Sequence, residues 1–171
     1  DVQLISFTGS TETGSRIGEV CGRMHKRLSL EMGGKNAMIV LDDANLELAL
    51  DGILWGAFGT TGQRCTATSR LIVQAGVHDK FLDLLATRVA KLTLGDGRVA
   101  GTDVGPLINE ESRTKVEEYV AIGKQEGSSL VTGGGRATGK GLEHGHFFTP
   151  TIYAGVKAGS RLDQEEIFGP L

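Results

Sequence analysis

The apolar positions of the chain alternate between short runs and helical stripes. Apolar runs typical of buried strands occupy residues 4–8, 28–30, 37–41, 70–73, 129–132 and 147–153. Apolar residues three and four positions apart predict helices over residues 12–24, 45–58 and 79–91. Residues 110–125 predict a more polar helix with acidic residues in its first turn. Strands that alternate with helices of this length predict an α/β fold with a mainly parallel sheet.

Glycine marks the segments between these elements. The chain has 26 glycines among 171 residues, about twice the usual share of roughly 7%. They are not periodic but cluster at turns, and they mark a predicted loop over residues 95–106 and a predicted hairpin or loop over residues 133–145. Because glycine has no side chain, other groups can approach its backbone closely, and we expect such close approaches at several turns.

Composition and charge exclude several classes of partner. Apolar residues make up 39% of the chain and charged residues 23%, as in soluble globular proteins. The net charge of −3 gives no basic surface for nucleic acid or an anionic membrane, and no apolar run approaches the roughly 18 residues that span a bilayer. The chain opens on Asp1 without a secretory leader, and its two cysteines make no disulfide framework, so we expect a reduced, cytoplasmic setting. Its abrupt ends predict a piece of a longer protein.

The first candidate site is the turn after the first predicted strand, residues 7–14 (FTGSTETG). Gly9 lets the backbone approach a ligand, and Ser10 is a good N-cap for a helix whose first N–H groups would face a phosphate. The turn lacks the G-x-G-x-x-G pattern. Taken alone, an ordinary strand–helix turn with a serine cap is the simpler interpretation.

Cys65 lies among small and polar residues, 59–70 (GTTGQRCTATSR), directly after an apolar helical stretch. Cysteines usually pack in a core, which suits Cys21 on the inner face of its predicted helix, but Gln63 and Arg64 are poor company in a core. Arg64 would also favour the thiolate form of a reactive thiol. Cys65 is therefore a candidate nucleophile, with an inert thiol lining a turn as the alternative.

Glu31 stands between two apolar residues and before a pair of glycines, in residues 30–35 (LEMGGK). Where water is scarce, the pKa of such a carboxyl rises toward the range of a general base. Glu31 is thus a candidate base, and a strand-end glutamate paired with Lys26 or Lys35 is the alternative.

The last candidate is an acidic pair before an aromatic residue and a Gly-Pro turn, residues 165–170 (EEIFGP). A solvated charge pair ahead of a turn is the alternative. His144 and His146 lie in a glycine-rich stretch without acidic or thiol ligands, so we expect no metal site.

Together the four segments resemble the NAD(P)-dependent aldehyde dehydrogenase superfamily. Residues 7–11 resemble its cofactor turn, residues 30–35 its glutamate motif, residues 62–65 its nucleophile motif and residues 166–170 its nicotinamide-ribose motif. They stand in family order along the whole chain. The resemblance implies an α/β fold: the end of a Rossmann-like cofactor domain over residues 1–33, then most of a catalytic domain with a mainly parallel sheet over residues 34–171.

The resemblance also implies roles. Cys65 would be the nucleophile that adds to a small-molecule aldehyde, its backbone N–H holding part of the oxyanion, and Glu31 would activate water to hydrolyse the thioester. NAD or NADP would be the cofactor. Its implied contacts are Gly9, Ser10 and Gly14 at the pyrophosphate, Met32 at the carboxamide, Glu166 at the ribose and Phe168 near the nicotinamide.

Subclass and completeness follow from the same resemblance. The glutamate motif implies the hydrolytic, acid-forming type, because relatives that pass the acyl group to coenzyme A often lack it. The sequence of residues 62–65 (GQRC) resembles the semialdehyde-oxidising branches more than the general ones. The family's oxyanion asparagine and adenosine-ribose residues would lie before Asp1, and its C-terminal oligomerisation strand after Leu171, so we expect the parent protein to be a homo-oligomer.

Two other interpretations stay open. The chain would fold but turn nothing over if it keeps the motifs without the rest of the machinery. A cysteine hydrolase built on Cys65 and Glu31 would leave the cofactor motifs unexplained.

Overall fold

The chain divides into two compact units, residues Asp1–Gly34 and Lys35–Leu171. A computed structural model describes residues 1–139 and 141–171. The division falls next to the domain boundary predicted from the sequence. The assignment of residues 1–33 to a cofactor domain and residues 34–171 to a catalytic domain stays a prediction.

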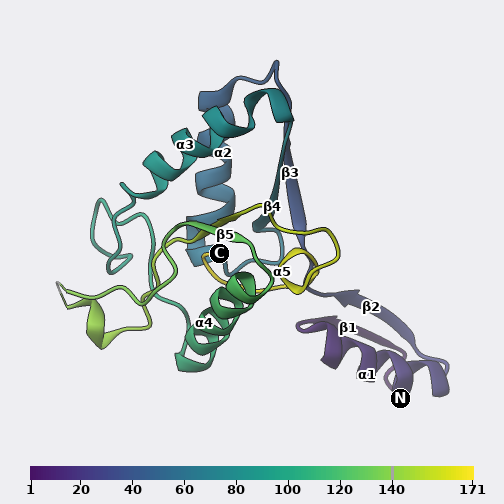
Figure 1. Cartoon of the computed structure of the whole chain (residues 1–171). Coiled ribbons are helices and arrows are strands. Elements are labelled where there is room, and N and C mark those ends of the chain that lie inside the picture. Colours follow the sequence, from purple (N-terminus) through teal and green to yellow (C-terminus); the bar gives the residue numbers. More distant parts are fainter. Residues whose placement is uncertain (140) are drawn as a thin grey trace. The chain divides into compact units, whose positions relative to one another are not determined.

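The first unit is a single β-α-β motif. Strand β1 (Leu4–Thr8) leads into helix α1 (Thr11–Arg23), and β2 (Arg27–Glu31) returns parallel to β1 (Figure 1). The helix begins at residue 11 because the Ser10 side chain accepts a hydrogen bond from the Thr13 N–H. Both strands therefore end at the same edge, where the pairing closes on Thr8 and Glu31.

The second unit opens with another β-α-β motif. Strand β3 (Asn36–Val40), helix α2 (Leu46–Phe58) and strand β4 (Thr68–Val73) follow one another, β3 and β4 pair in parallel, and α3 (His78–Val89) lies beside α2 (Figure 1). Apolar faces of these elements share one core: Val40, Leu50, Ile53, Phe58, Phe81, Leu85, Val89 and Val104. The core fixes the C-terminal end of α2, from which the chain turns toward Cys65.

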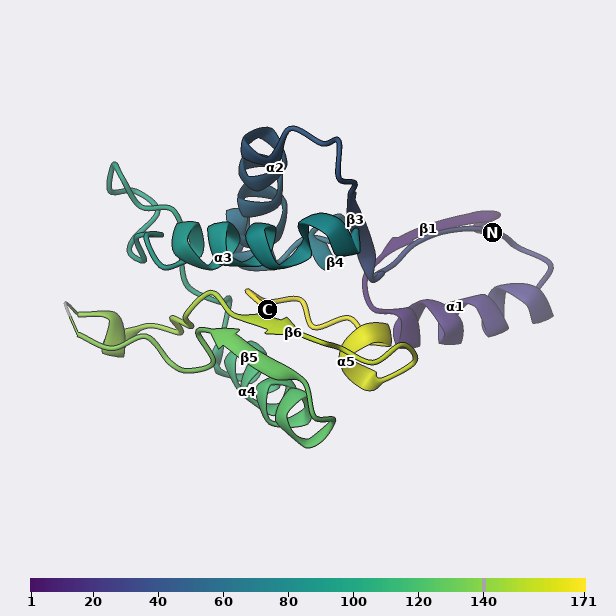
Figure 2. The same ribbon diagram turned by 45° about the horizontal axis from the view of Figure 1, so that its top comes forward.

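The rest of the second unit surrounds α4 (Glu110–Gln125). Strands β5 (Ser129–Thr132) and β6 (Ile152–Ala154) pair antiparallel beside it, and the one-turn helix α5 (Arg161–Gln164) follows (Figure 2). Short 3-10 turns occupy Gly59–Gly62, Ala75–Val77 and Leu142–His144. A second core holds these elements together: Leu107, Val116, Tyr119, Val120, Phe148, Leu162 and Ile167.

The predicted strand over residues 147–153 is mostly wrong. Only its end lies in a strand, β6, and earlier residues make a single bridge between Arg136 and Phe148. Pro150 has no N–H to give to a ladder. The hydroxyl oxygens of Thr149 and Thr151 instead accept hydrogen bonds from the Gly135 and Gly134 N–H groups, at 3.2 and 2.9 Å. The other predicted helices and strands are confirmed, with ends shifted by no more than two residues.

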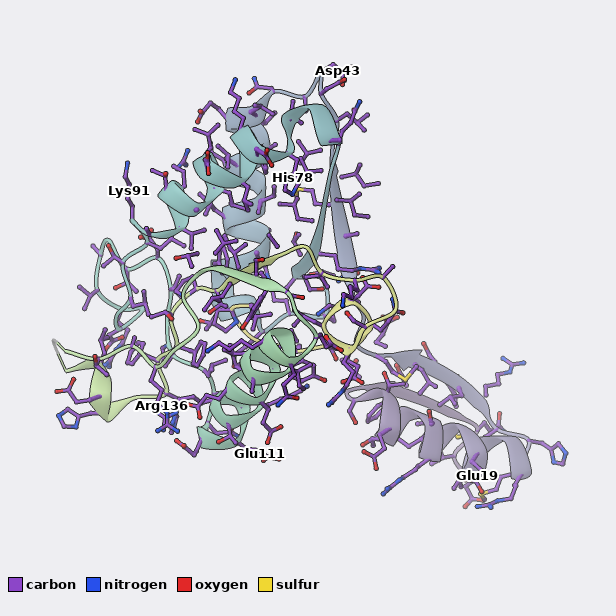
Figure 3. The ribbon with its side chains drawn as sticks, viewed as in Figure 1. Glu19, Asp43, His78, Lys91, Glu111 and Arg136 are labelled. Atoms are coloured by element: carbon purple, nitrogen blue, oxygen red, sulfur yellow. The ribbon has the colours of Figure 1, made fainter. Side chains whose placement is uncertain are left out.

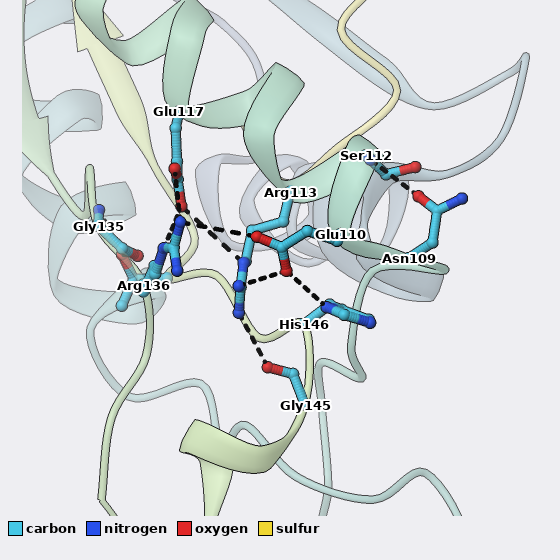
Figure 4. A network of polar contacts seen from close by, with 10 residues as sticks. Asn109, Glu110, Ser112, Arg113, Glu117, Gly135, Arg136, Gly145 and His146 are labelled. Carbon is cyan, nitrogen blue, oxygen red and sulfur yellow. Dashed lines mark hydrogen bonds and ion pairs between the residues drawn. The ribbon is translucent and has the colours of Figure 1, made fainter.

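An ion-pair network ties the glycine-rich segment after β5 to the start of α4 (Figure 4). Glu110 contacts Arg113 and lies 3.2 Å from His146 Nδ1 and 3.7 Å from the Arg136 guanidinium. Arg136 also binds the Glu117 carboxylate, about two turns further along the helix than Glu110. The network is structural, since it holds a loop against a helix and its histidine is paired with a carboxylate.

Charged side chains such as Glu19 on α1 and Lys91 beyond α3 are exposed (Figure 3). Within residues 1–139 and 141–171, no helix is both long and apolar enough to cross a membrane. The same residues contain no group of three or more His, Cys, Asp or Glu side chains that would hold a metal ion.

Candidate active site

The first unit places the two motifs predicted for it side by side. The Gly9 N–H donates to the Glu31 carbonyl at 3.0 Å, which extends the parallel pairing past the ends of β1 and β2. The turn after β1 and the segment after β2 therefore leave the same sheet edge. In open α/β sheets, ligands bind at this carboxyl edge of the strands.

Side chains crowd the glycines at both ends of this turn. A Cβ on Gly14 would overlap the Met32 sulfur, and a Cβ on Gly9 would overlap the Phe7 ring. Gly14 is buried in the first turn of α1, so Met32 packs directly against the helix start. Gly9, Gly14 and Met32, all predicted to contact the cofactor, thus lie in one place.

The helix start offers free hydrogen-bond donors. Ser10 accepts from the Thr13 N–H at 3.2 Å and its carbonyl accepts from Gly14, whereas the N–H groups of Thr11 and Glu12 donate to no acceptor in the described part of the chain. Such N–H groups, with the positive end of the helix dipole, suit a phosphate. The turn therefore fits a pyrophosphate.

Glu31 is exposed at the end of β2. The expectation that it stands where water is scarce is therefore wrong for this chain. The alternative pairing is not seen either, because none of the ion pairs among the described residues includes Glu31. Its carboxylate is open to solvent and to whatever approaches this edge.

In the second unit, the turn before Cys65 has an uncommon backbone. Thr60, Thr61 and Gly62 are left-handed in succession, with φ of 57°, 59° and 67°. A left-handed non-glycine residue costs on the order of 1–3 kcal/mol and persists only where its surroundings hold it. Two threonines in a row here therefore require strong local constraints.

Those constraints come from the segment that precedes α4. The buried Thr61 hydroxyl donates to the Gly105 carbonyl at 3.1 Å. Gln63 bridges the next residues, since its amide oxygen accepts from the Ile108 N–H at 2.9 Å and its amide nitrogen lies 3.4 Å from the Pro106 carbonyl. The polar residues that are unsuited to a core thus serve as the locks of this turn.

Arg64 is directed at the end of α2. Its guanidinium donates to the Trp55 carbonyl at 3.0 Å and the Gly56 carbonyl at 3.4 Å, and it lies 4.1 Å from the centre of the Trp55 ring. A cation at these C-terminal carbonyls is favourable. The expectation that Arg64 favours a thiolate gains no support, because these contacts occupy the charge at the helix end.

Cys65 is exposed, and Cys21 is buried, as predicted. The Cys65 carbonyl accepts from the Asn36 side-chain amide at 2.6 Å, and the same amide lies 3.3 Å from the Ala67 carbonyl. The Cys65 N–H donates to no acceptor among residues 1–139 and 141–171. The thiol thus stands on a fixed backbone beside an N–H that is available to an oxyanion.

The segment with Glu166 and Phe168 packs directly onto this turn. A Cβ on Gly62 would overlap the Gly169 carbonyl, and a Cβ on Gly169 would overlap the Val116 side chain of α4. Gly169 is therefore held between the turn and the helix. Phe168 is 42% exposed with φ of 60°, and Glu166 is partly exposed. The structure brings the nucleophile motif and the predicted ribose motif together.

Lys35 stands near the same segment without a close ion pair among the described residues. Burial and the Arg70 guanidinium lower the pKa of its ammonium from 10.5 to about 8, against the opposing carboxylates of Asp163 and Glu166. Lys35 also lines a cavity of about 510 Å³ along β4 and β6. Cys65 does not line that cavity, so it is not the thiol's substrate pocket.

The comparisons with known proteins agree with these motifs. The sequence model of the aldehyde dehydrogenase family matches residues 1–171. The chain is 47% identical to a betaine aldehyde dehydrogenase of Bacillus subtilis over 171 residues, which are 100% of the chain and 35% of the relative. It is 45% identical to the succinate-semialdehyde dehydrogenase [NADP(+)] of Escherichia coli over 99% of the chain and 34% of the relative.

Solved structures give the same answer. A crystal structure of apo betaine aldehyde dehydrogenase from Staphylococcus aureus, a point mutant with a BME-modified cysteine, superposes with a TM-score of 0.97 at 44% identity, over 99% of this chain and 34% of that one. The enzyme in complex with NAD+ superposes with a TM-score of 0.96 at 43% identity over the same shares.

This chain belongs to the aldehyde dehydrogenase family. The family and the α/β fold predicted from the sequence are confirmed, and so is the nicotinamide cofactor at the level of the family. The chain spans about a third of the length of these relatives. The roles of individual residues stay predictions.

Sequence reasoning missed three residues that shape the site. Asn36, which holds the Cys65 carbonyl, looks like an ordinary strand residue. Lys35 gave a signal only as a possible partner of Glu31, and Tyr119 gave none at all. Asn36 binds Cys65 and Tyr119 binds Glu165, and both contacts join residues distant in the sequence, which no local pattern records.

Proposed function

We propose that this chain carries the nucleophile, the deacylating base and much of the cofactor site of an NAD(P)-dependent aldehyde dehydrogenase that forms carboxylic acids. The observation that supports this most is the Cys65 turn. An exposed thiol stands on a strained, locked backbone with its own N–H free among the described residues.

Cys65 is proposed to attack the aldehyde carbonyl. Its sulfur forms a bond to the carbonyl carbon, and the resulting oxyanion is held partly by the Cys65 N–H. The lock from Asn36 to the Cys65 carbonyl keeps this peptide in one orientation. Bound NAD(P)+ supplies the hydride acceptor that turns the thiohemiacetal into a thioester.

The residues of the first unit fit such a cofactor. The Phe7 ring and the Met32 sulfur pack closely on Gly9 and Gly14, and the first N–H groups of α1 are free among residues 1–139 and 141–171. Ser10 fixes the helix start. The Met32 carbonyl is assigned to the nicotinamide carboxamide. In the second unit, Glu166 is assigned to the ribose hydroxyls and Phe168 to the nicotinamide face.

Glu31 is proposed to take a proton from the water that hydrolyses the thioester. The C–S bond breaks, the carboxylic acid leaves and the Cys65 thiol is restored. A solvent-exposed carboxylate at the end of β2 is accessible to water. This step distinguishes an acid-forming enzyme from one that passes its acyl group to coenzyme A.

The proposed substrate class rests on the sequence of the nucleophile motif and on the names of two relatives. Residues 62–65 (GQRC) lean toward a semialdehyde, and one relative is named a succinate-semialdehyde dehydrogenase. Another is named a betaine aldehyde dehydrogenase. Comparing kcat/KM for succinate semialdehyde and betaine aldehyde decides between an anionic and a cationic substrate. We further propose a cytoplasmic location and a homo-oligomeric parent protein; size-exclusion chromatography with light scattering tests the oligomeric state.

The deciding experiment measures NAD(P)H formation by the full-length protein that carries this chain. Cys65→Ala is expected to abolish turnover, whereas Cys21→Ala, which alters the buried thiol, retains it. Turnover by Cys65→Ala would remove the nucleophile from the proposal.

Glu31 is tested in the same assay. Glu31→Gln is expected to leave a burst of about one NAD(P)H per active site followed by slow turnover, because acylation proceeds and deacylation does not. Glu19→Gln, an exposed carboxylate on α1, serves as the control. An unchanged steady-state rate in Glu31→Gln excludes Glu31 from the mechanism.

A second candidate is a folded chain that keeps these motifs without turnover. It is favoured by the coverage, since the chain matches only about a third of its relatives. The 171-residue chain alone is then expected to give little or no NAD(P)H, and robust turnover by it contradicts this candidate.

A further inference from the structure

The stretch from Glu165 to Gly169 alternates between two sides. Ile167 is buried in the α4 core, and Gly169 packs on Val116 of α4. Glu165 also turns toward α4, where it binds Tyr119. Phe168, 42% exposed, faces the other way. Glu165, Ile167 and Gly169 thus anchor the stretch, whereas Phe168 and the partly exposed Glu166 make none of these anchoring contacts.

The anchor at Glu165 is a group of polar contacts. Its carboxylate accepts from the Tyr119 hydroxyl at 2.6 Å, and both of its oxygens lie 3.0 Å from Arg161 Nε. The Arg161 guanidinium also lies 5.7 Å from the centre of the Tyr119 ring. Three side chains from α4, α5 and the stretch itself thus converge on one point.

A second helix contact fixes α5 next to this point. Glu126, at the C-terminal end of α4, accepts from the backbone N–H groups of Arg161 at 2.8 Å and Leu162 at 3.2 Å. The other end of the stretch is held as well, because the Thr151 N–H donates to the Pro170 carbonyl at 2.8 Å. With both ends fixed, the left-handed φ of Phe168 is maintained.

We infer that Tyr119 and Glu165 are positioning residues: the hydrogen bond between them holds the stretch so that Glu166 and Phe168 are presented for the nicotinamide end of the cofactor. The inference rests on the proposed function, since it assumes that Glu166 and Phe168 meet the cofactor. Neither Tyr119 nor Glu165 touches the cofactor in this proposal. They act only through the backbone of the stretch.

Electrostatics keep this anchor intact over the working range of pH. Hydrogen bonds from Arg161 and Tyr119 lower the pKa of the Glu165 carboxyl to about 2. Burial, with the bond to Glu165, raises the pKa of Tyr119 to about 12. The carboxylate is therefore charged and the phenol protonated between these values, which is the arrangement of a strong, charge-assisted hydrogen bond.

The test compares two tyrosines that pack on the same core but donate to different acceptors. Tyr119 donates to Glu165, whereas Tyr153 donates to the Val120 carbonyl of the same helix at 2.7 Å and packs on the same core. In the full-length protein, Tyr119→Phe is expected to raise KM for NAD(P)+ about tenfold with KM for the aldehyde unchanged. Both variants lose one hydrogen bond and are expected to lower thermal stability to a similar extent. Tyr153→Phe, however, is expected to leave both KM values unchanged.

Glu165→Gln and Glu165→Ala test the same contact in two steps. The amide oxygen still accepts from Tyr119 but carries no charge for Arg161, so KM for NAD(P)+ is expected to rise less than in Glu165→Ala. Equal cofactor KM values in Tyr119→Phe, Tyr153→Phe and the parent protein overturn the inference.

Hydrogen–deuterium exchange separates this inference from the proposed function. Tyr119→Phe is expected to speed exchange in the peptide covering residues 165–171 more than Tyr153→Phe does, whether or not the protein turns over. Faster exchange without any NAD(P)H formation by the parent protein removes the proposed function and with it the cofactor role, but keeps the anchor. Equal exchange in the two variants overturns the anchor even in an active enzyme.

Discussion

The two turns that carry the candidate chemistry are built in opposite ways. The turn after β1, from Gly9 to Gly14, has an ordinary N-cap and no left-handed residue, and its neighbours Phe7, Glu31 and Met32 belong to the same β-α-β motif. The turn after α2 has three left-handed residues in a row, and its neighbours come from a segment over 40 residues away and from Gly169. One turn is held within a single β-α-β motif, and the other depends on segments far along the second unit.

The difference reflects what each turn is proposed to hold. A diphosphate is bound by backbone N–H groups, and any helix start supplies these. A thiol that must meet a carbonyl carbon needs one orientation, which a relaxed loop does not supply. Backbone strain at the Cys65 turn, absent from the turn after β1, is therefore consistent with catalysis at the one and binding at the other.

The largest effect is expected from adding one methyl group to each turn. Gly62→Ala places a Cβ against the Gly169 backbone at a left-handed φ, so we expect a loss of about 3 kcal/mol or more in the free energy of unfolding. Gly9→Ala meets only the tip of the Phe7 ring, which can rotate away, and we expect less than about 1 kcal/mol. Chemical denaturation monitored by circular dichroism measures both.

Gly76→Ala is the control for the added methyl group, because nothing lies within 4 Å of its Cβ position. If Gly62→Ala and Gly9→Ala cost the same, the contrast between a relaxed and a strained turn is wrong.

The next effect concerns the lock at the end of α2. Arg64→Ala removes two hydrogen bonds to helix carbonyls and the stacking on Trp55, for which we expect a loss of about 2 kcal/mol. Arg64→Lys keeps the charge but not the planar fork and is expected to recover only part of it. Trp55 is the one tryptophan of the chain, so its fluorescence reports on this turn. An unchanged emission spectrum in Arg64→Ala contradicts the stacking.

A smaller effect is expected at the local turn. Ser10→Ala removes the cap of α1, at a cost of about 1 kcal/mol, and should speed amide exchange in the first turn of that helix. Ser160→Ala, which removes the equivalent cap of α5, is the comparison, since its helix is held by Glu126 as well. Faster exchange around α5 than around α1 would reverse this ranking.

The smallest effect depends on pH. The folded chain binds the Lys35 proton less tightly than the unfolded chain, because the folded pKa is about 8 and the ordinary value 10.5. Charged Lys35 therefore reduces stability below pH 8, and the penalty disappears as the pH rises from about 8 to 10.5. Lys35→Met is expected to add about 0.5–1 kcal/mol at pH 7, discounted for partial solvent exposure.

The exposed Lys91 provides the control for this charge. Lys91→Met is expected to change stability by less than about 0.5 kcal/mol at either pH. A gain in Lys35→Met that persists above pH 10.5 would come from packing and not from the buried charge.

Periodicity predicted most of the fold because its elements are local. The apolar faces of α2 and α3 could be read from spacing, and Ser10 marked a helix start. The predicted strand over residues 147–153 failed because Thr149 and Thr151 bind glycines of a distant loop, a competition that alternating hydrophobicity does not reveal.

The candidate site divides along the same line. Cys65, as a thiol in polar company, could be selected from sequence, but the left-handed Thr60 and Thr61 could not, since threonine does not favour that region. Glu31 was predicted where water is scarce but is exposed. Arg64 was predicted to act on the thiol but binds the end of α2. Both depend on where the chain runs next, and a short window of sequence does not carry that information.

The contact between Gly62 and Gly169 also orders events in time. The two glycines are more than a hundred positions apart, so the backbone that presents Cys65 cannot close until the ribosome has released the second partner. At about 5–20 residues per second, that interval is on the order of ten seconds. A nascent chain thus carries its thiol on an open loop and acquires the nucleophile's geometry only late in synthesis.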